Sequence, residues 1–363
     1  MAWTKFKSDF ILFAVFFSVT VFKSQTVFAV PLACEKLFLP SKVSAVDQLN
    51  RPRRSAISQI FKLSEDRPVF YEYIEPSNKQ QPTLLFLPGI NRGLTLNDET
   101  AKILIKKGYG IIGFATSAHW QSSGQVPANT KPYFLSQAES KEPMTAADFA
   151  FEVESLVGLL KKQKLVFNQI IPVTVSYSAT IAAHLSKEHF SQIIETTPMG
   201  NFAESNVQAH EYMQNLKNSF AWNPFMGGWL DNMTLQSYRK VWQTYVRQIY
   251  DQSSSALQQP YENVLEGYVY LVKAAENFDL RNLDYKNTSQ RQFIFAEHEE
   301  STRLGIQQQA FEMYNQSLAP ADSTKQPIVI AKATHLAIAE NPKAYVEALE
   351  HALKNFAKLK IVK

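Results

Sequence analysis

The feature that most constrains the fold of this chain is an alternation of short apolar runs with longer amphipathic segments. Residues 82–89 and 110–116 are continuous apolar runs with the length of buried strands. Residues 145–164 carry apolar side chains at helical spacing, and the first of them, Thr145, is a favourable N-cap. Strands that alternate with helices of this length are typical of βαβ units. We therefore expect an α/β fold with a mainly parallel sheet flanked by helices.

The same alternation continues along the chain on both sides of these segments. Residues 68–76 alternate in polarity, which predicts an early antiparallel strand, and residues 179–190 and 341–359 predict two further helices. Four more apolar runs predict strands at residues 170–176, 191–198, 291–297 and 327–334.

Residues 201–284 interrupt this alternation. The stretch is rich in Trp, Tyr, Phe, Asn and Gln and has the pattern of several helices. We interpret it as a helical cap inserted between two strands, so that residues 30–200 and 285–363 together form the core. The aromatic side chains of the cap, Trp222, Phe225 and Trp229 among them, would either line an apolar substrate-binding site or form a small core of the cap itself.

The N-terminus has the order of an export signal. Lys5 and Lys7 precede an apolar run at residues 10–22, and Ala29 ends a stretch suited to a signal peptidase. We therefore expect residues 1–29 to be a signal peptide and the protein to be exported, either periplasmic or secreted. Retention as an N-terminal membrane anchor is the alternative. Cys34 is the only cysteine, so no internal disulfide can form.

Charge and motifs exclude several classes of partner. The net charge is +4 with no dense basic cluster, which argues against a nucleic-acid-binding surface. The densest basic run, residues 51–54, predicts a solvated loop, with peripheral membrane contact as the alternative. The histidines lack metal-ligand spacing, and no phosphate-cradling motif is present. We therefore expect neither a metal nor a cofactor, and the sequence gives no signal of an oligomeric state.

Ser178 lies where an apolar run ends and a helical pattern begins. At a sharp strand-to-helix turn of this kind, a serine with small residues two positions away on each side can present its Oγ as a nucleophile. Ser176 and Thr180 stand here in place of the two glycines of the usual G-x-S-x-G pattern. The alternative is that Ser178 only caps the helix.

A base and an acid for such a serine follow the last two predicted strands. His335 comes directly after one strand, and an imidazole there can accept the serine proton and later pass it to the leaving group. A carboxylate after the preceding strand would hold that imidazole in the correct tautomer. The candidates for this acid are Glu297, Glu299 and Glu300.

An oxyanion hole requires backbone N–H groups directed at the developing negative oxygen. We assign one to Ala179, which directly follows the candidate nucleophile, and the other to Ile90, which follows the strand at residues 82–89. Gly89 lets the backbone turn closely at that point.

The order of these motifs resembles that of the α/β-hydrolase family. The matching stretches are residues 84–93, 108–124, 175–180, 293–300 and 332–342, and His119 falls at a histidine of the second stretch. The resemblance implies that Ser178 is the nucleophile, Glu299 the acid and His335 the base.

A serine nucleophile favours attack on an acyl carbonyl and a covalent acyl-enzyme. The sequence therefore predicts an exported serine hydrolase of the esterase or lipase type, whose substrate is a small-molecule or lipid ester with an apolar acyl or alkyl group. Two alternatives are an amidase or peptidase-type acyl hydrolase and a non-catalytic binding protein that keeps the fold. The absence of both glycines from the turn around Ser178 would be consistent with a non-catalytic binding protein.

Overall fold

The structure is a computed structural model, and it divides into two compact units. One unit comprises residues 41–202 and 238–363, and the other comprises residues 1–40 and 203–237. The predicted signal peptide, Cys34, the basic run at 51–54 and Trp222 lie outside the described residues. Those residues are 56–200 and 224–361, apart from 79, 141, 167, 254–255, 277, 287–288, 300–303, 319–322 and 324–325.

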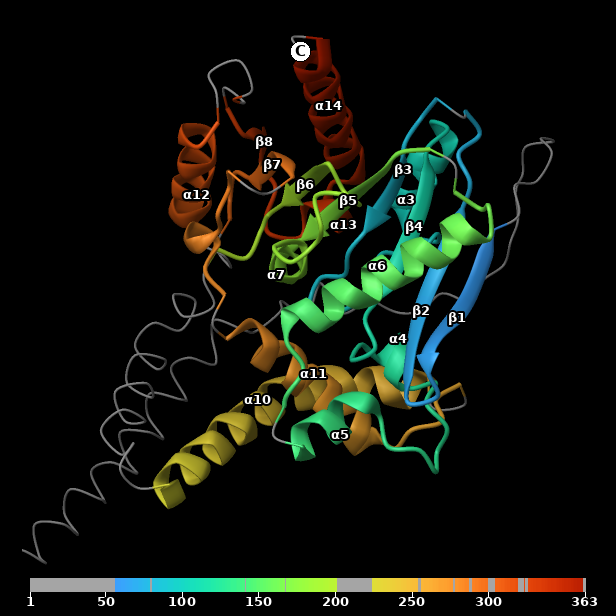
Figure 1. Ribbon diagram of the computed structural model, residues 1–363, viewed down its shortest axis with the longest axis vertical. Helices are drawn as coiled ribbons and strands as arrows, with labels where there is room; N and C mark the ends of the chain where they lie inside the picture. Colours follow the sequence, from blue (N-terminus) through green and yellow to red (C-terminus); the bar gives the residue numbers. More distant parts are fainter. Residues whose placement is uncertain are drawn as a thin grey trace, which may run out of the picture. The chain divides into compact units, whose positions relative to one another are not determined.

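The larger unit is built on an eight-stranded sheet with the strand order β1-β2-β4-β3-β5-β6-β7-β8 (Figure 1). The strand β2 is antiparallel to both β1 and β4, and the remaining neighbours pair in parallel. This arrangement confirms the predicted α/β class. The strands are β1 (Ile57–Ser64), β2 (Arg67–Ile74), β3 (Thr83–Phe86), β4 (Gly110–Ala115), β5 (Ile170–Val175), β6 (Gln192–Thr196), β7 (Gln290–Ala296) and β8 (Ile328–Ile330).

The helices follow the strands as the alternating pattern predicts. Those before β6 are α3 (Glu99–Lys106), α4 (Trp120–Ser123), α5 (Tyr133–Glu139), α6 (Ala146–Lys162), the 3₁₀ turn η2 (Ser176–Ser178) and α7 (Ala179–Ala182). Those after β6 are α10 (Pro224–Ser253), α11 (Tyr261–Ala275), η3 (Leu280–Asn282), α12 (Leu304–Gln316), α13 (Ala337–Glu340) and α14 (Pro342–Ile361).

Several elements differ from the sequence-based expectation. The helices α4 and α5 were not predicted, and β8 ends at Ile330, several residues before the predicted end. The strand β1 was not predicted, because it is an edge strand with no fully buried side chain and therefore lacks an apolar run. The helix expected over residues 179–190 ends at Ala182. His184 already bonds three residues back, to the carbonyl of Ile181, and the N–H of Ser186 is taken by the carboxylate of Glu154 on α6.

The sheet is buried on both faces, which explains the continuous apolar runs of its central strands. Leu84 and Phe86 of β3 point to one face, where they share a cluster with residues of α3 and α14. Leu85 and Leu87 point to the other face, because side chains alternate along a strand. There they share a cluster with α6, α7 and α11 (Figure 1).

The described part of the predicted cap contains α10, α11 and η3. Within the larger unit, Trp242 and Val246 of α10 and Tyr268 of α11 belong to the same buried cluster as the sheet. The ring of Trp242 stacks at 5.4 Å from that of Tyr268, and both rings contact Tyr245. These aromatic residues are therefore core residues that fix the two helices to the sheet domain.

Gly267 marks the closest approach of α11 to the core. A Cβ at this position would lie 2.2 Å from the carbonyl oxygen of Ala118, whereas one at Gly158 of α6 would meet nothing within 4 Å. We predict that Gly267→Ala destabilises the protein by about 1–3 kcal/mol through overpacking. Gly158→Ala is the matched control and should stabilise it by up to about 1 kcal/mol through helix propensity. Urea unfolding measures the free energy of unfolding of both variants. Equal changes in the two would contradict the close approach of α11 at Gly267.

Candidate active site

The carboxyl ends of β5, β6, β7 and β8 meet at one edge of the sheet, because these four strands are parallel neighbours. The predicted serine, acid and histidine follow β5, β7 and β8 respectively. Thr197, directly after β6, lies between them and donates its hydroxyl to the carbonyl oxygen of His335 over 3.3 Å. The three segments are therefore gathered at the same edge.

Glu299 and His335 form a hydrogen-bonded pair at this edge. The Nδ1 of His335 lies 2.9 Å from Oε2 of Glu299. The carboxylate of Glu299 is fully buried, while the imidazole is 17% exposed. A carboxylate can only accept, so Nδ1 carries the proton and Nε2 is left as the proton acceptor, as a general base requires.

The choice among the three candidate acids follows from these contacts. Glu297 is exposed and its carboxylate accepts from the backbone N–H of Lys332 at 2.7 Å. Glu300 lies outside the described residues. Glu299 is the carboxylate that contacts the imidazole, in agreement with the sequence-based choice.

Ser178 does not have the geometry of a nucleophile. Its side chain is completely buried, and its Oγ accepts from the N–H of Val175 at 2.7 Å. The same Oγ can donate a hydrogen bond to the carbonyl oxygen of Leu87 at 3.3 Å. In the part of the chain that the structure describes, no hydrogen bond joins Ser178 to His335. The prediction of Ser178 as nucleophile therefore does not fit, because a nucleophilic Oγ must be accessible.

Ser176 is the more accessible of the two serines, and no hydrogen bond among the described residues joins it to His335 either. It directly follows β5, is half-buried, and adopts a φ of 53°. A left-handed backbone is strained for any residue except glycine and is typical of a sharp turn between strand and helix. Its carbonyl oxygen accepts from the N–H of Met199 at 3.0 Å and also faces the N–H of Ala179. These contacts hold the strained turn, with Ser176 at its tip.

The sequence contains the signal for Ser176, in a different register of the same pattern. Counting from Ser176, the two glycine positions of the nucleophile turn are occupied by Thr174 and Ser178. The strand ends at Val175, so Ser176 and not Ser178 is the first residue after it. The predicted strand ends at residue 176, one residue beyond its observed end, and so includes Ser176 itself.

The candidate oxyanion donors would also change if Ser176, and not Ser178, were the nucleophile. The N–H of Ala179 is directed at the carbonyl oxygen of Ser176 within the 3₁₀ turn, so it is not available to a substrate. The residue that follows Ser176 is Tyr177, whose N–H opens the helical turn and has no acceptor within it. Ile90 keeps its predicted place after β3, and no acceptor among the described residues takes its N–H.

His119 contacts the loop after β3 that carries Ile90. Its side chain is fully buried; Nε2 donates to the carbonyl oxygen of Gly89 at 3.0 Å, and Nδ1 accepts from Oγ1 of Thr116 at 2.7 Å. Burial lowers the pKa of His119 to about 4. The imidazole is therefore neutral near pH 7.

The predicted substrate-binding aromatics lie in the least described part of the chain. Phe225 and Trp229 belong to the first turns of α10.

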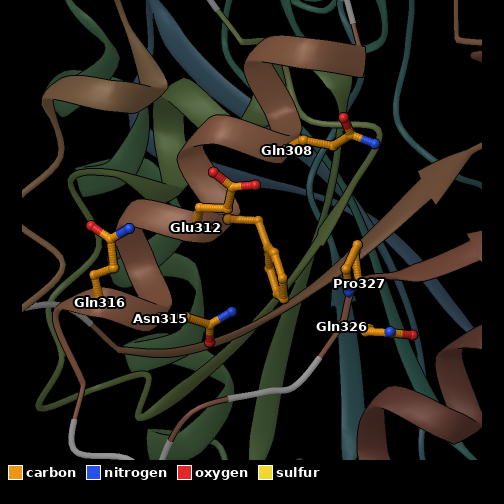
Figure 2. Close-up of a pocket in the computed structure, with 7 residues that line it drawn as sticks. Gln308, Glu312, Asn315, Gln316, Gln326 and Pro327 are labelled. Carbon is orange, nitrogen blue, oxygen red and sulfur yellow. The ribbon is translucent and has the colours of Figure 1, made fainter.

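A hollow of about 540 Å³ on α12 is lined by Phe311, Glu312 and Pro327, among others (Figure 2). Pro327 directly precedes β8, so this hollow lies at the opposite end of that strand from His335.

The described residues contain no group of three or more His, Cys, Asp or Glu side chains placed to hold a metal ion. None of the described helices has both the length and the apolar character of a membrane span.

The chain has the α/β-hydrolase fold, which confirms the sequence-based resemblance at the level of fold. It is similar to a carboxylesterase structure from the thaumarchaeon Nitrososphaera gargenis, with a TM-score of 0.52, 13% identity and coverage of 83% of this chain and 99% of that one. It is also similar to an esterase from Exiguobacterium antarcticum, with a TM-score of 0.50, 14% identity and coverage of 79% and 96%. No protein-family model and no curated protein matches the chain.

The buried, neutral His119 predicts a pH dependence of stability. Between pH values of about 4 and 6.5 the unfolded chain binds a proton at this histidine that the folded chain does not, so stability falls as pH falls. Relative to a His119→Gln variant, the wild type should lose about 2 kcal/mol more between pH values of about 7 and 5. Urea unfolding at the two pH values measures this. A difference between the two proteins that is independent of pH would contradict the buried neutral state.

Proposed function

We propose that this protein is an exported serine hydrolase that cleaves carboxylic esters, with Ser176 as nucleophile, His335 as base and Glu299 as the residue that orients the base. The observation that carries the proposal is the partly buried Glu299–His335 hydrogen bond, at the sheet edge where Ser176 follows β5 in a left-handed backbone conformation. The esterases among the structures of similar fold are consistent with this reaction class.

The geometry supports a two-step acyl transfer. The Oγ of Ser176 attacks the ester carbonyl while Nε2 of His335 takes its proton. The tetrahedral oxyanion is bound by the N–H groups of Ile90 and Tyr177. The proton then passes to the leaving alcohol, and an acyl-enzyme remains. A water molecule, deprotonated by the same imidazole, releases the acid and restores the serine.

The substrate class rests on the predicted cap. Its aromatic residues, Trp222, Phe225 and Trp229 among them, favour an apolar acyl or alkyl group on a small-molecule or lipid ester. The sequence pattern of residues 1–29 supports export, and a mature N-terminus at Val30 is the observation that checks it.

The choice between the two serines can be tested with a fluorophosphonate probe and with p-nitrophenyl esters. We expect Ser176→Ala to abolish both labelling and turnover. Ser178→Ala should keep the labelling but lose about 1–3 kcal/mol of stability, because the buried N–H of Val175 loses its acceptor.

The reverse result, with labelling lost in Ser178→Ala and kept in Ser176→Ala, would restore Ser178 as nucleophile. A wild type that is neither labelled nor active would favour the non-catalytic binding protein. Hydrolysis of aminoacyl amides without hydrolysis of esters would favour the amidase or peptidase alternative.

The role of Glu299 can be tested against its neighbour. Glu299→Gln removes the acceptor that fixes the tautomer of His335, so kcat should fall by about 10³- to 10⁴-fold. Glu297→Gln is the matched control, because Glu297 is exposed and contacts Lys332 instead. Steady-state ester hydrolysis measures both variants. An equal loss of kcat in the two variants would rule out Glu299 as the residue that orients His335.

A further inference from the structure

The mechanism above leaves one buried histidine unused. His119 is completely buried, at a position that neither accepts the serine proton nor contacts Glu299. Its two ring nitrogens are both engaged, one by Gly89 and one by Thr116. A neutral imidazole that is fully hydrogen-bonded in this way acts as a fixed donor at Nε2.

The bond to Gly89 determines where the Ile90 N–H points. The carbonyl of Gly89 and the N–H of Ile90 belong to the same peptide unit, which is planar and trans. The two groups of a trans peptide point in opposite directions. By holding the Gly89 carbonyl, His119 turns the Ile90 N–H away from itself, and no acceptor among the described residues takes that N–H.

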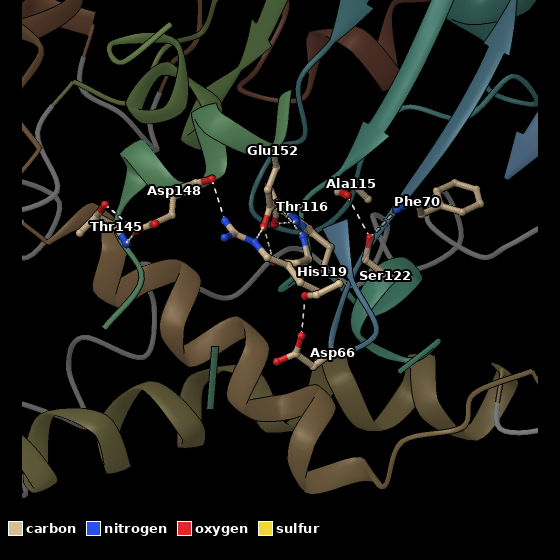
Figure 3. Close-up of polar contacts among 12 residues, drawn as sticks. Asp66, Phe70, Ala115, Thr116, His119, Ser122, Thr145, Asp148 and Glu152 are labelled. Atoms are coloured by element: carbon tan, nitrogen blue, oxygen red, sulfur yellow. Dashed lines mark hydrogen bonds and ion pairs between the residues drawn. The ribbon is translucent and has the colours of Figure 1, made fainter. Parts of the chain in front are cut away.

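The histidine is itself held by a buried polar network (Figure 3). Oγ1 of Thr116 donates to Nδ1, which fixes the tautomer that has its proton on Nε2. The next residue, Ser117, donates its N–H to the carboxylate of Glu152 at 2.9 Å. Glu152 in turn pairs with Arg67 of β2 at 2.8 Å. The turn that carries His119 is thus anchored to two elements of the sheet domain.

The other side of the same loop is held by the inserted helices. The hydroxyls of Tyr245 on α10 and Tyr268 on α11 both donate to the carbonyl oxygen of Asn91, at 3.0 and 2.7 Å. The Gly89–Ile90 and Asn91–Arg92 peptide units on either side of Ile90 are therefore each held by side-chain donors.

We propose that His119 is a positioning residue that presets the Ile90 N–H as an oxyanion donor through its hydrogen bond to the Gly89 carbonyl. The inference rests on the proposed function. His119 touches no reacting atom, and its effect passes through one peptide unit. The hydrogen bond also polarises that peptide, which makes its N–H a stronger donor.

The test compares His119→Phe, which cannot donate, with His119→Gln, whose amide can donate to the same carbonyl. Active sites are counted by end-point fluorophosphonate labelling, and kcat and KM are measured per labelled site with p-nitrophenyl esters. We expect His119→Phe to lower kcat by about 10- to 100-fold with little change in KM, which is part of the loss for a missing oxyanion donor. His119→Gln should retain most of the kcat that His119→Phe loses.

A boronate inhibitor supplies a readout that a purely structural role would not change. Its tetrahedral adduct places an oxygen where the oxyanion forms, so its inhibition constant should rise in His119→Phe by the same factor by which kcat/KM falls. Should His119→Phe fail to fold, Thr116→Val serves instead. It frees the imidazole to change tautomer and should lower kcat in the same direction.

The outcomes separate the inference from the proposed function. A wild type without labelling or turnover would overturn the proposed function. An active wild type whose variants keep kcat per labelled site within about twofold would overturn the role of His119 alone. The same conclusion would follow if activity fell only in proportion to the number of labelled sites.

Discussion

The strained turn at Ser176 is the constraint on which the candidate site depends. A left-handed backbone costs a non-glycine residue about 1–2 kcal/mol, which the surrounding structure must offset. Here Met199 and Ala179 donate to the carbonyl of Ser176, while the buried hydroxyl of Ser178 ties the turn to the ends of β3 and β5. The hydroxyl that the sequence suggested as the reactive group is thus part of the support for its neighbour.

Much of the fold could be predicted because buried parallel strands have a simple sequence pattern. Strands buried on both faces read as continuous apolar runs, and β3, β4, β5 and β6 were all found from them. The same reasoning placed His335 and the group Glu297, Glu299 and Glu300 near the carboxyl edge, since residues that follow a parallel strand lie there; the choice of Glu299 came from the family resemblance.

The choice of nucleophile could not be made in this way. Ser176 and Ser178 flank the same tyrosine and are chemically identical, so the motif fits either register. The difference lies in the φ of Ser176, which is set by partners distant in sequence, such as Met199 after β6. The short α7 has a similar cause, because Glu154 on another helix takes the N–H that would have continued it. Backbone conformation that depends on tertiary partners leaves little trace in a single sequence.

The two tyrosine hydroxyls on Asn91 bear on how this chain can evolve. Insertions between the strands of a hydrolase sheet are often regarded as interchangeable modules that alter selectivity and leave the reaction centre untouched. Here part of the insertion is hydrogen-bonded to the loop that carries Ile90, so the two cannot drift independently. A replacement insertion would have to bring its own donors to that loop. Under the proposed function, a change in substrate preference would therefore also affect turnover.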